Sequence, residues 1–168
     1  AKYWPTAKVV GTDPTDAMLE EAAKVVRKKV SSDPEYKNIR WQNGLAEEIA
    51  LPDESVDLVT IAFGYRNISD DHKQRARQEA LRVLKPGGVY AILELGLPEN
   101  GSKRKIYKFL LAKAMPKFAG LFGPRGAYEY LARSILQFPR PAQIKKDLQN
   151  DGFIALAPRP FSQGMAWL

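Results

Sequence analysis

Residues Ala62 to Asn67 (AFGYRN) place a guanidinium and a carboxamide directly after the apolar run VDLVTI. Such a run is typical of a buried β-strand, and ligands in an open α/β sheet bind beyond the carboxyl ends of the strands. Arg66 stays charged at neutral pH, so it cannot act as a base, but it can stabilise a developing anion or orient a water. Asn67 can hold that water or a ligand oxygen. Considered singly, Arg66 could instead form a surface ion pair, and Asn67 could be a turn residue.

Two further expected strand ends carry groups that could bind a ligand. Asp13 ends the strand AKVVGTD, where an acidic side chain can accept two hydrogen bonds from a ribose diol. Residues 43–46 stand at the end of the strand IRWQNG, in which Ile39 and Trp41 alternate with polar residues. We expect these two strand ends and residues 62–67 to line one crevice. The alternative for Asp13 taken alone is an N-terminal helix cap in TDPTD.

The elements that position these side chains alternate along the chain. Helical spacing of apolar residues predicts a helix that ends near residue 30, and a second helix over about 70–84 with Ser69 as its N-cap. The sequence KPGG stops that helix, and the apolar run VYAILELG follows as a strand. A later helix starts at Pro141 and ends at Gly152, before the strands IALAPRPF and GMAWL. The alternation predicts a parallel α/β sheet with helices on both faces.

Residues 100–140 interrupt this alternation. The helical segment SKRKIYKFLLAKAMPKF has apolar residues on one side and lysines elsewhere, and YEYLARSILQF is a second amphipathic helix. We interpret residues 100–140 as a helical insertion that covers one edge of a pocket. The length of 168 residues indicates a single domain over residues 1–168.

The composition excludes several classes of site. The chain has no cysteine, which excludes disulfides and thiolate metal sites. The single histidine, His72, lies in the charged stretch SDDHKQ and is predicted to be exposed, so we expect no histidine-based triad and no metal site. The formal net charge of +7 would attract nucleic acid, acidic lipid or a phosphorylated ligand, or it could reflect an ordinary basic surface.

Several motifs in this order resemble the ubiquinone and menaquinone biosynthesis C-methyltransferase family, whose members use S-adenosylmethionine. They are VVGTDPTDAML, AEEIALPDESVDLVTIAFGYRN, LRVLKPGG, LELGLPEN, YEYLARSI and LQNDGF. Within them, FGYRN matches the family's FGxRN signature, YEYLARSI its YxYLxxSI segment, and MPKFAG its LPxxG turn. VLKPGG is shared by many class I methyltransferases and is less specific. The resemblance covers residues 9–168 and implies a Rossmann-like class I methyltransferase fold.

The resemblance also implies roles for individual residues. Asp13 would hold the ribose hydroxyls of S-adenosylmethionine, and Met18 would pack near the adenine. Leu45 and Ala46 would flank the adenine, and Ala62 would line the methionine side of the cofactor. Arg66 and Asn67 would face the quinol ring as the catalytic pair. The substrate-binding side chains would be Phe63, Tyr128 and Tyr130.

The implied reaction is C-methylation of a polyprenyl benzoquinol or naphthoquinol. The helical insertion could accept the prenyl tail on its apolar face and rest its lysines on anionic lipid, or it could be a lid with solvated lysines. The implied location is the bacterial cytoplasm or the matrix side of the mitochondrial inner membrane, peripheral to the membrane. A homodimer or a quinone-biosynthesis complex is compatible with the resemblance, and no nucleic-acid partner is expected.

Two departures from the family pattern keep other functions open. The first strand of the family and its Gly-rich turn have no counterpart before Asp13, so we expect a fragment in which two strands keep an unpaired edge. Leu45 stands where the family has Asp or Asn. A catalytically silent methyltransferase-like binding or scaffold subunit is therefore one alternative, and a methyltransferase-like protein that acts on RNA is another.

Overall fold

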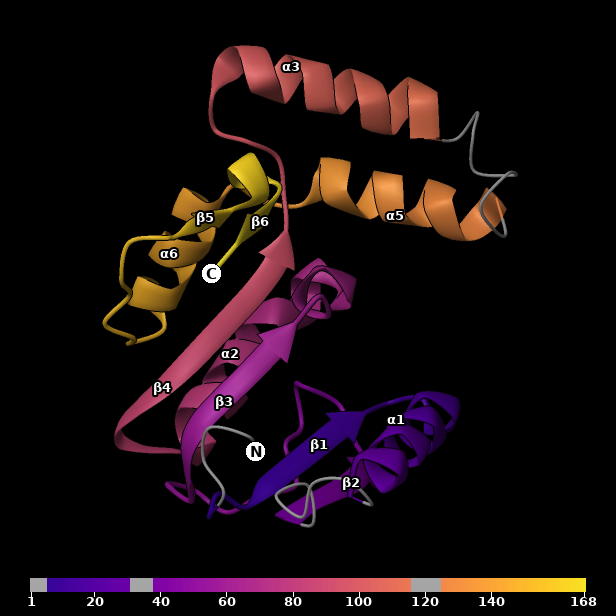
Figure 1. The fold of residues 1–168 in the computed structure, drawn as a ribbon. Coiled ribbons are helices and arrows are strands. Elements are labelled where there is room, and N and C mark those ends of the chain that lie inside the picture. Colours follow the sequence, from indigo (N-terminus) through magenta and orange to yellow (C-terminus); the bar gives the residue numbers. More distant parts are fainter. Residues whose placement is uncertain (1–5, 31–37, 116–124) are drawn as a thin grey trace. The chain divides into compact units, whose positions relative to one another are not determined.

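The computed structural model describes residues 6–30, 38–115 and 125–168 of the chain (Figure 1). The chain divides into two compact units, residues 1–51 and residues 52–168, and each unit is described by itself. The single domain over residues 1–168 stays a prediction.

The first unit is a β–α–β element. β1 (Val9–Asp13) and β2 (Ile39–Asn43) are parallel, with Val9 opposite Ile39 and Asp13 opposite Asn43. α1 (Asp16–Val30) connects them and is acidic in its first turn and basic in its last, which complements the helix dipole. These elements confirm the strand–helix–strand pattern expected for this part of the sequence.

A glycine lets the two strands of the first unit pack closely. Gly11 lies opposite Trp41, and a Cβ at Gly11 would stand 2.3 Å from the nearest atom of the indole ring. No side chain larger than hydrogen fits beneath the ring at that distance. The indole ring of Trp41 can therefore lie over the backbone of Gly11 only because Gly11 has no side chain.

The second unit contains a mixed sheet with the strand order β3-β4-β6-β5. β3 (Val56–Ala62) and β4 (Leu84–Leu95) are parallel and are joined through α2 (Asp70–Val83). α2 ends where predicted, but KPGG is part of β4, where the pairing jumps from Val56–Leu84 to Leu58–Val89. The extra residues form a bulge, which the positive φ of Gly87 (80°) permits.

α2 packs against β4 of this sheet (Figure 1). Ala76, Ala80 and Val83 are buried at helical spacing and form part of the core of the second unit. Ser69 is the N-cap residue as predicted, although its side chain makes no capping hydrogen bond to the backbone.

The last two strands are much shorter than the sequence predicts. β5 covers only Pro160–Phe161 and β6 only Ala166–Trp167, and both pairings are antiparallel. The last backbone pair joins Arg159 and Leu168, with N···O distances of 2.7 and 3.0 Å. An extended segment forms a strand only where its backbone is paired, and residues 154–158 have no paired strand among the described residues. A cavity of about 910 Å³ lies between this segment and β4.

The expectation that β3 is covered on both faces is wrong for the described residues. None of its residues is buried, and Leu58 is 45% exposed. Within the parts of the chain that the structure describes, β3 pairs only with β4, and β1 only with β2. Each of these strands therefore has one unpaired edge, as the sequence predicted.

The described parts of residues 100–140 are largely helical, as expected. α3 (Gly101–Phe109) is capped by Asn100, whose side chain accepts hydrogen bonds from Ser102 N and Lys103 N, both at 3.1 Å. It continues as the π-helix η3 (Leu110–Ala114), and α5 (Arg125–Gln137) follows. Most of the MPKFAG motif lies outside the described residues.

α6 (Pro141–Asn150) begins at the predicted proline and is followed by Gly152, whose φ is 102°. No helix among residues 6–30, 38–115 and 125–168 is long and apolar enough to cross a membrane.

We predict that Gly11→Ala lowers the free energy of unfolding by roughly 1–3 kcal/mol, because the added methyl overlaps the ring of Trp41. Urea denaturation followed by circular dichroism measures the change. Gly44→Ala is the matched control in the same unit, because its Cβ would meet Thr12 at an ordinary 3.9 Å. Equal stability of the two variants would contradict the proposed packing.

Candidate functional site

The FGYRN sequence forms a tight turn at the carboxyl end of β3. Phe63 has a positive φ of 58° and is 45% exposed, and residues Tyr65–Asn67 form the 3-10 helix η2. Asn67 N donates to Gly64 O at 3.0 Å, which closes the turn. Three successive side chains thus have very different surroundings: Tyr65 is buried, Arg66 is half-buried and Asn67 is exposed.

Tyr65 anchors the turn in the core. Its side chain is 1% exposed, packs edge-to-face on Phe138 with ring centroids 6.2 Å apart, and its hydroxyl accepts a hydrogen bond from Arg77 Nη1 at 3.0 Å. Arg77 also forms an ion pair with Asp151, so the buried guanidinium is neutralised. Burial raises the pKa of the Tyr65 hydroxyl, and the hydrogen bond from Arg77 opposes this shift.

Arg66 is held by a carboxylate on the neighbouring strand. Its Nη1 lies 2.5 Å from Glu94 Oε1, and its backbone N donates to Glu94 Oε2 at 3.0 Å. The side chains of the pair are 10% and 3% exposed, respectively. Arg66 Nη1 also donates to Phe63 O at 2.7 Å, and Nε donates to Ser134 Oγ at 3.3 Å. The guanidinium therefore connects the turn to β4 and to α5.

Sequence reasoning missed Glu94. The available signal was a single acidic residue inside the apolar strand VYAILEL, where an unpaired charge would be costly. Both oxygens of Glu94 accept hydrogen bonds. Oε2 accepts from Arg66 N, and Oε1 accepts from Arg66 Nη1 and from Leu95 N, the latter at 2.8 Å. A buried acid in a strand indicates a partner that the sequence alone does not identify.

Asn67 and Tyr130, both predicted site residues, are brought together. The hydroxyl of Tyr130 donates to Asn67 Oδ1 at 3.0 Å. The N–H groups of Asn67 Nδ2 are not used in this hydrogen bond and can donate to another group. Tyr130 and Ser134 are four residues apart on α5 and therefore share one helix face. Tyr128 lies on the same helix and is half-buried. The structure thus places Arg66, Asn67 and Tyr130 in one cluster of side chains.

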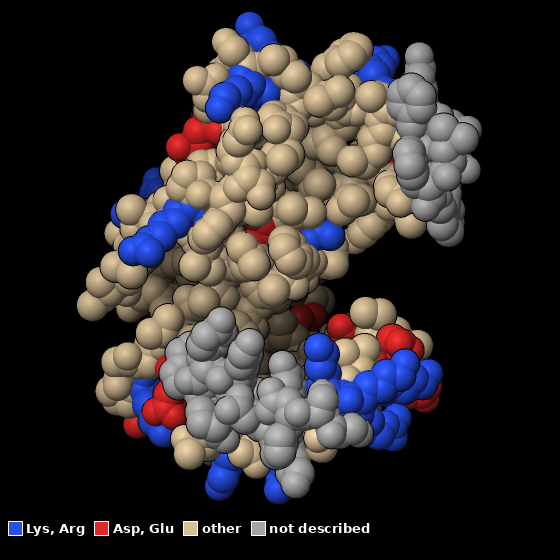
Figure 2. Space-filling view, in the orientation of Figure 1, with Lys and Arg blue, Asp and Glu red and all other residues tan. Residues whose placement is uncertain are grey.

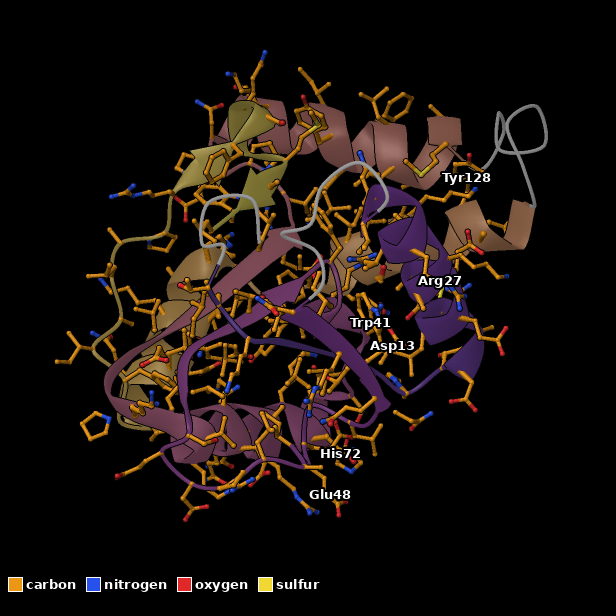
Figure 3. All side chains as sticks on the ribbon, turned by 60° about the horizontal axis from the view of Figure 1, so that its bottom comes forward. Asp13, Arg27, Trp41, Glu48, His72 and Tyr128 are labelled. Atoms are coloured by element: carbon orange, nitrogen blue, oxygen red, sulfur yellow. The ribbon has the colours of Figure 1, made fainter. Side chains whose placement is uncertain are left out.

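In the first unit, Asp13 shapes the start of α1 (Figure 3). Its Oδ1 accepts a hydrogen bond from Thr15 N at 2.8 Å, which forms a turn before α1 begins at Asp16. Asp13 therefore lies two residues before the N-cap position, and the alternative that it caps the helix itself is wrong. Asn43 Nδ2 donates to Pro14 O at 3.2 Å and to Asp16 Oδ1 at 2.7 Å, which ties the end of β2 to the same loop. Among the described residues, Asp13 Oδ2 has no hydrogen-bond partner and is available to a ligand.

Of the other predicted cofactor-binding residues, Met18 lies in the first turn of α1, whereas Leu45 and Ala62 lie at or near strand ends. Met18 is 59% exposed and Leu45 is 45% exposed, and a bridge joins Leu45 to Glu48 beside Ala46. Ala62 is the last residue of β3 and is exposed. Their roles, and the crevice that was expected to join all three strand ends, stay predictions.

Nothing in the described part of the chain forms a cluster of acidic, histidine or cysteine side chains that could hold a metal. The side chain of His72 is 54% exposed, as predicted. The cavity beside β4 is lined by Glu94, but Arg66, Asn67 and Tyr130 do not line it.

Comparisons with known proteins give a consistent result. Residues 2–168 match the model of the ubiE/COQ5 methyltransferase family. The chain is 37% identical to the ubiquinone/menaquinone biosynthesis C-methyltransferase UbiE of Geobacter sulfurreducens, covering 96% of this chain and 61% of that protein. It is 38% identical to the demethylmenaquinone methyltransferase of Chlorobaculum tepidum, covering 89% and 57%. The chain thus spans about three-fifths of the length of these curated relatives.

Solved structures share the fold at lower identity. A SAM-dependent methyltransferase from Aquifex aeolicus superposes with a TM-score of 0.63 and 19% identity, over 95% of this chain and 65% of that one. The [4+2]-cyclase SpnF superposes with a TM-score of 0.64 and 21% identity, over 94% and 46%. These likenesses establish the methyltransferase-type α/β fold, and the cyclase indicates that this fold alone does not determine the reaction.

We predict that the stabilising effect of Tyr65 is lost at high pH. The folded-state pKa of Tyr65 is raised above the ordinary value of 10.0, so its contribution is complete below pH 10 and falls as the pH rises through the folded-state pKa. Tyr65→Phe should cost roughly 1–2 kcal/mol at pH 8, because Arg77 loses a buried partner. Urea denaturation at pH 8 and pH 11 should show the difference from wild type shrinking, and a difference independent of pH would contradict this prediction.

Proposed function

The chain belongs to the ubiE/COQ5 methyltransferase family, and we propose from this membership that it carries out S-adenosylmethionine-dependent C-methylation of a polyprenyl benzoquinol or naphthoquinol. The supporting observation in the structure is the FGYRN turn, where Arg66, Asn67 and Tyr130 form one polar cluster at a strand end. Polar groups at the carboxyl end of a parallel strand are where α/β proteins bind their ligands.

The donor and acceptor groups of the first unit fit the cofactor. S-adenosylmethionine carries a ribose diol, which needs acceptors, and an activated methyl group on a sulfonium. Asp13 has one carboxylate oxygen used by Thr15 and a second one open to a diol. Met18 and Leu45 offer exposed apolar surface for an adenine ring, although Leu45 cannot accept a hydrogen bond from its amino group.

The FGYRN turn supplies the chemistry at the acceptor ring. C-methylation needs an electron-rich ring carbon, so a phenolic proton must leave or be shared. We assign Asn67 Nδ2 as the donor to the ring oxygen, because Oδ1 is already engaged by Tyr130. Glu94 already accepts hydrogen bonds at both oxygens, so a water held at the turn is our proposed proton acceptor. Phe63 and Tyr128 would pack against the ring.

The helices α3 and η3 suit a peripheral contact with an anionic membrane. Ile106, Phe109 and Leu110 share one helix face and are 59%, 64% and 44% exposed. Exposed lysines border this face at positions 103, 105 and 113, Lys108 lies on the opposite side of the helix, and Figure 2 shows Lys and Arg side chains around α3. An exposed apolar stripe bordered by lysines matches helices that lie in the interface of acidic lipids. A prenylated acceptor would then reach the chain from the bilayer.

Two other functions are less well supported. A silent binding or scaffold subunit is motivated by Leu45, which departs from the family pattern at the adenine. An RNA-directed activity would use the net charge of +7. Proteins that bind single-stranded RNA gather basic side chains along one groove with stacking aromatics, whereas the lysines and arginines of this chain are dispersed along the sequence.

We predict micromolar binding of S-adenosylmethionine that depends on Asp13. Asp13→Asn keeps an acceptor for Thr15 N but removes the second acceptor for the diol, so affinity should fall by about tenfold or more. Isothermal titration calorimetry measures it, with Glu20→Gln on the exposed face of α1 as the charge-matched control. A folded chain that binds no S-adenosylmethionine would contradict the proposal and would favour a silent subunit.

We also predict binding to vesicles that contain phosphatidylserine but not to pure phosphatidylcholine. Each lysine near an anionic surface contributes about 1 kcal/mol, so Lys103→Gln with Lys105→Gln should weaken binding roughly 30-fold. The control removes two charges elsewhere, with Lys24→Gln and Lys28→Gln on α1. Vesicle binding is measured by co-sedimentation. If both double variants lose the same share of binding, the effect of charge is nonspecific and the assignment to α3 is overturned.

A further inference from the structure

The Arg66–Glu94 pair is electrically neutral but has unused hydrogen-bond donors. Arg66 Nη1 and Nε are occupied by Glu94, Phe63 and Ser134. Nη2 has no partner among residues 6–30, 38–115 and 125–168. Within the same residues, every fully buried side-chain nitrogen or oxygen has a partner except Gln42 Nε2. Arg66 Nη2 has no partner, so it is not fully buried and is in contact with solvent. The guanidinium thus presents N–H groups to a ligand while its charge is balanced from behind.

Burial of Glu94 strengthens the charge neutralisation of Arg66. Glu94 is 2% exposed, and its Oε1 lies 2.5 Å from Arg66 Nη1, so water screens the pair only weakly. Ser134, which accepts from Arg66, lies one helical turn from Tyr130, which donates to Asn67. Arg66 and Asn67 are therefore both held against the same face of α5, and both retain N–H donors.

We propose that Glu94 determines the charge selectivity of the acceptor site: by cancelling the charge of Arg66, it makes the site bind an uncharged ring oxygen in preference to a carboxylate. This inference rests on the proposed function, which places the acceptor ring at Arg66 and Asn67. An uncompensated arginine favours an anionic ligand, because guanidinium and carboxylate form strong bidentate hydrogen bonds. A guanidinium already paired with a buried carboxylate has lost that preference but can still donate to a phenol oxygen. Glu94 acts here through Arg66, as a positioning residue that need not touch the acceptor.

The test compares two small probes that differ in charge. Hydroquinone is neutral at pH 7, and 4-hydroxybenzoate carries a carboxylate of similar size. Amide chemical shifts of α5 and of residues 62–67, followed by NMR at fixed ionic strength, give a dissociation constant for each probe. Wild type should bind hydroquinone more tightly. In Glu94→Gln, the affinity for 4-hydroxybenzoate relative to hydroquinone should rise at least tenfold.

The control and a second variant separate charge from structure. Glu99→Gln removes the same charge at an exposed site and should leave the ratio of the two affinities unchanged. Glu94→Gln leaves the half-buried guanidinium of Arg66 without its anion, which destabilises the second unit. The double variant Arg66→Gln with Glu94→Gln removes both charges, and its ratio should stay within about threefold of wild type, since the wild-type pair is already neutral.

The outcomes distinguish this inference from the proposed function. An unchanged ratio in folded Glu94→Gln overturns the inference. So does a tenfold loss of relative affinity for 4-hydroxybenzoate in the double variant, because Arg66 would then act as a free charge in wild type. If neither probe changes the amide chemical shifts of α5 or of residues 62–67 in wild type, the acceptor does not bind at this site. Both the proposed function and this inference then fail.

Discussion

A half-buried guanidinium next to a buried carboxylate is the interaction on which the arrangement of the site depends. Neither Arg66 nor Glu94 could be buried alone, because an isolated charge in a protein interior costs several kcal/mol. Together they satisfy each other and leave Arg66 joined to β4, to the turn and to α5. The adjacent Tyr65 makes a second such connection, through Arg77 and Asp151. The turn is thus held by two anchors, and the side chain of Asn67, which follows them, is held by Tyr130.

The sheet makes these contacts possible by bringing distant residues into register. β3 and β4 are parallel, with Ala62 opposite Leu93, so the turn that follows β3 meets Glu94 at the corresponding end of β4. α2 provides the crossover and packs against β4. α5 then approaches the same end and contributes Tyr130 and Ser134. The site is formed by three elements, and the parallel strand pair aligns two of them, the turn after β3 and the end of β4.

Family membership and the site support the same function at different levels of detail. The family match covers nearly the whole chain, whereas the chain spans about three-fifths of its curated relatives. The fold itself is shared with a cyclase, so the reaction has to be argued from the residues at the strand ends. Asp13 combines a structural bond to Thr15 with a free oxygen, and the Arg66–Glu94 pair combines structural support with free donors. In both cases a structural contact fixes the orientation in which the remaining groups meet a ligand.

The sequence by itself determined the elements with clear periodicity, the location of the FGYRN turn and the family resemblance. These features are local, since a helical repeat or a motif is complete within a few neighbouring residues. Only the tertiary structure decided that Glu94 neutralises Arg66 across 28 positions of the chain and that Tyr130 donates to Asn67. It also decided that residues 154–158, although apolar enough for a strand, lack the backbone partner that a strand needs. Pairing between distant segments depends on where the whole chain places them, and no local pattern records that.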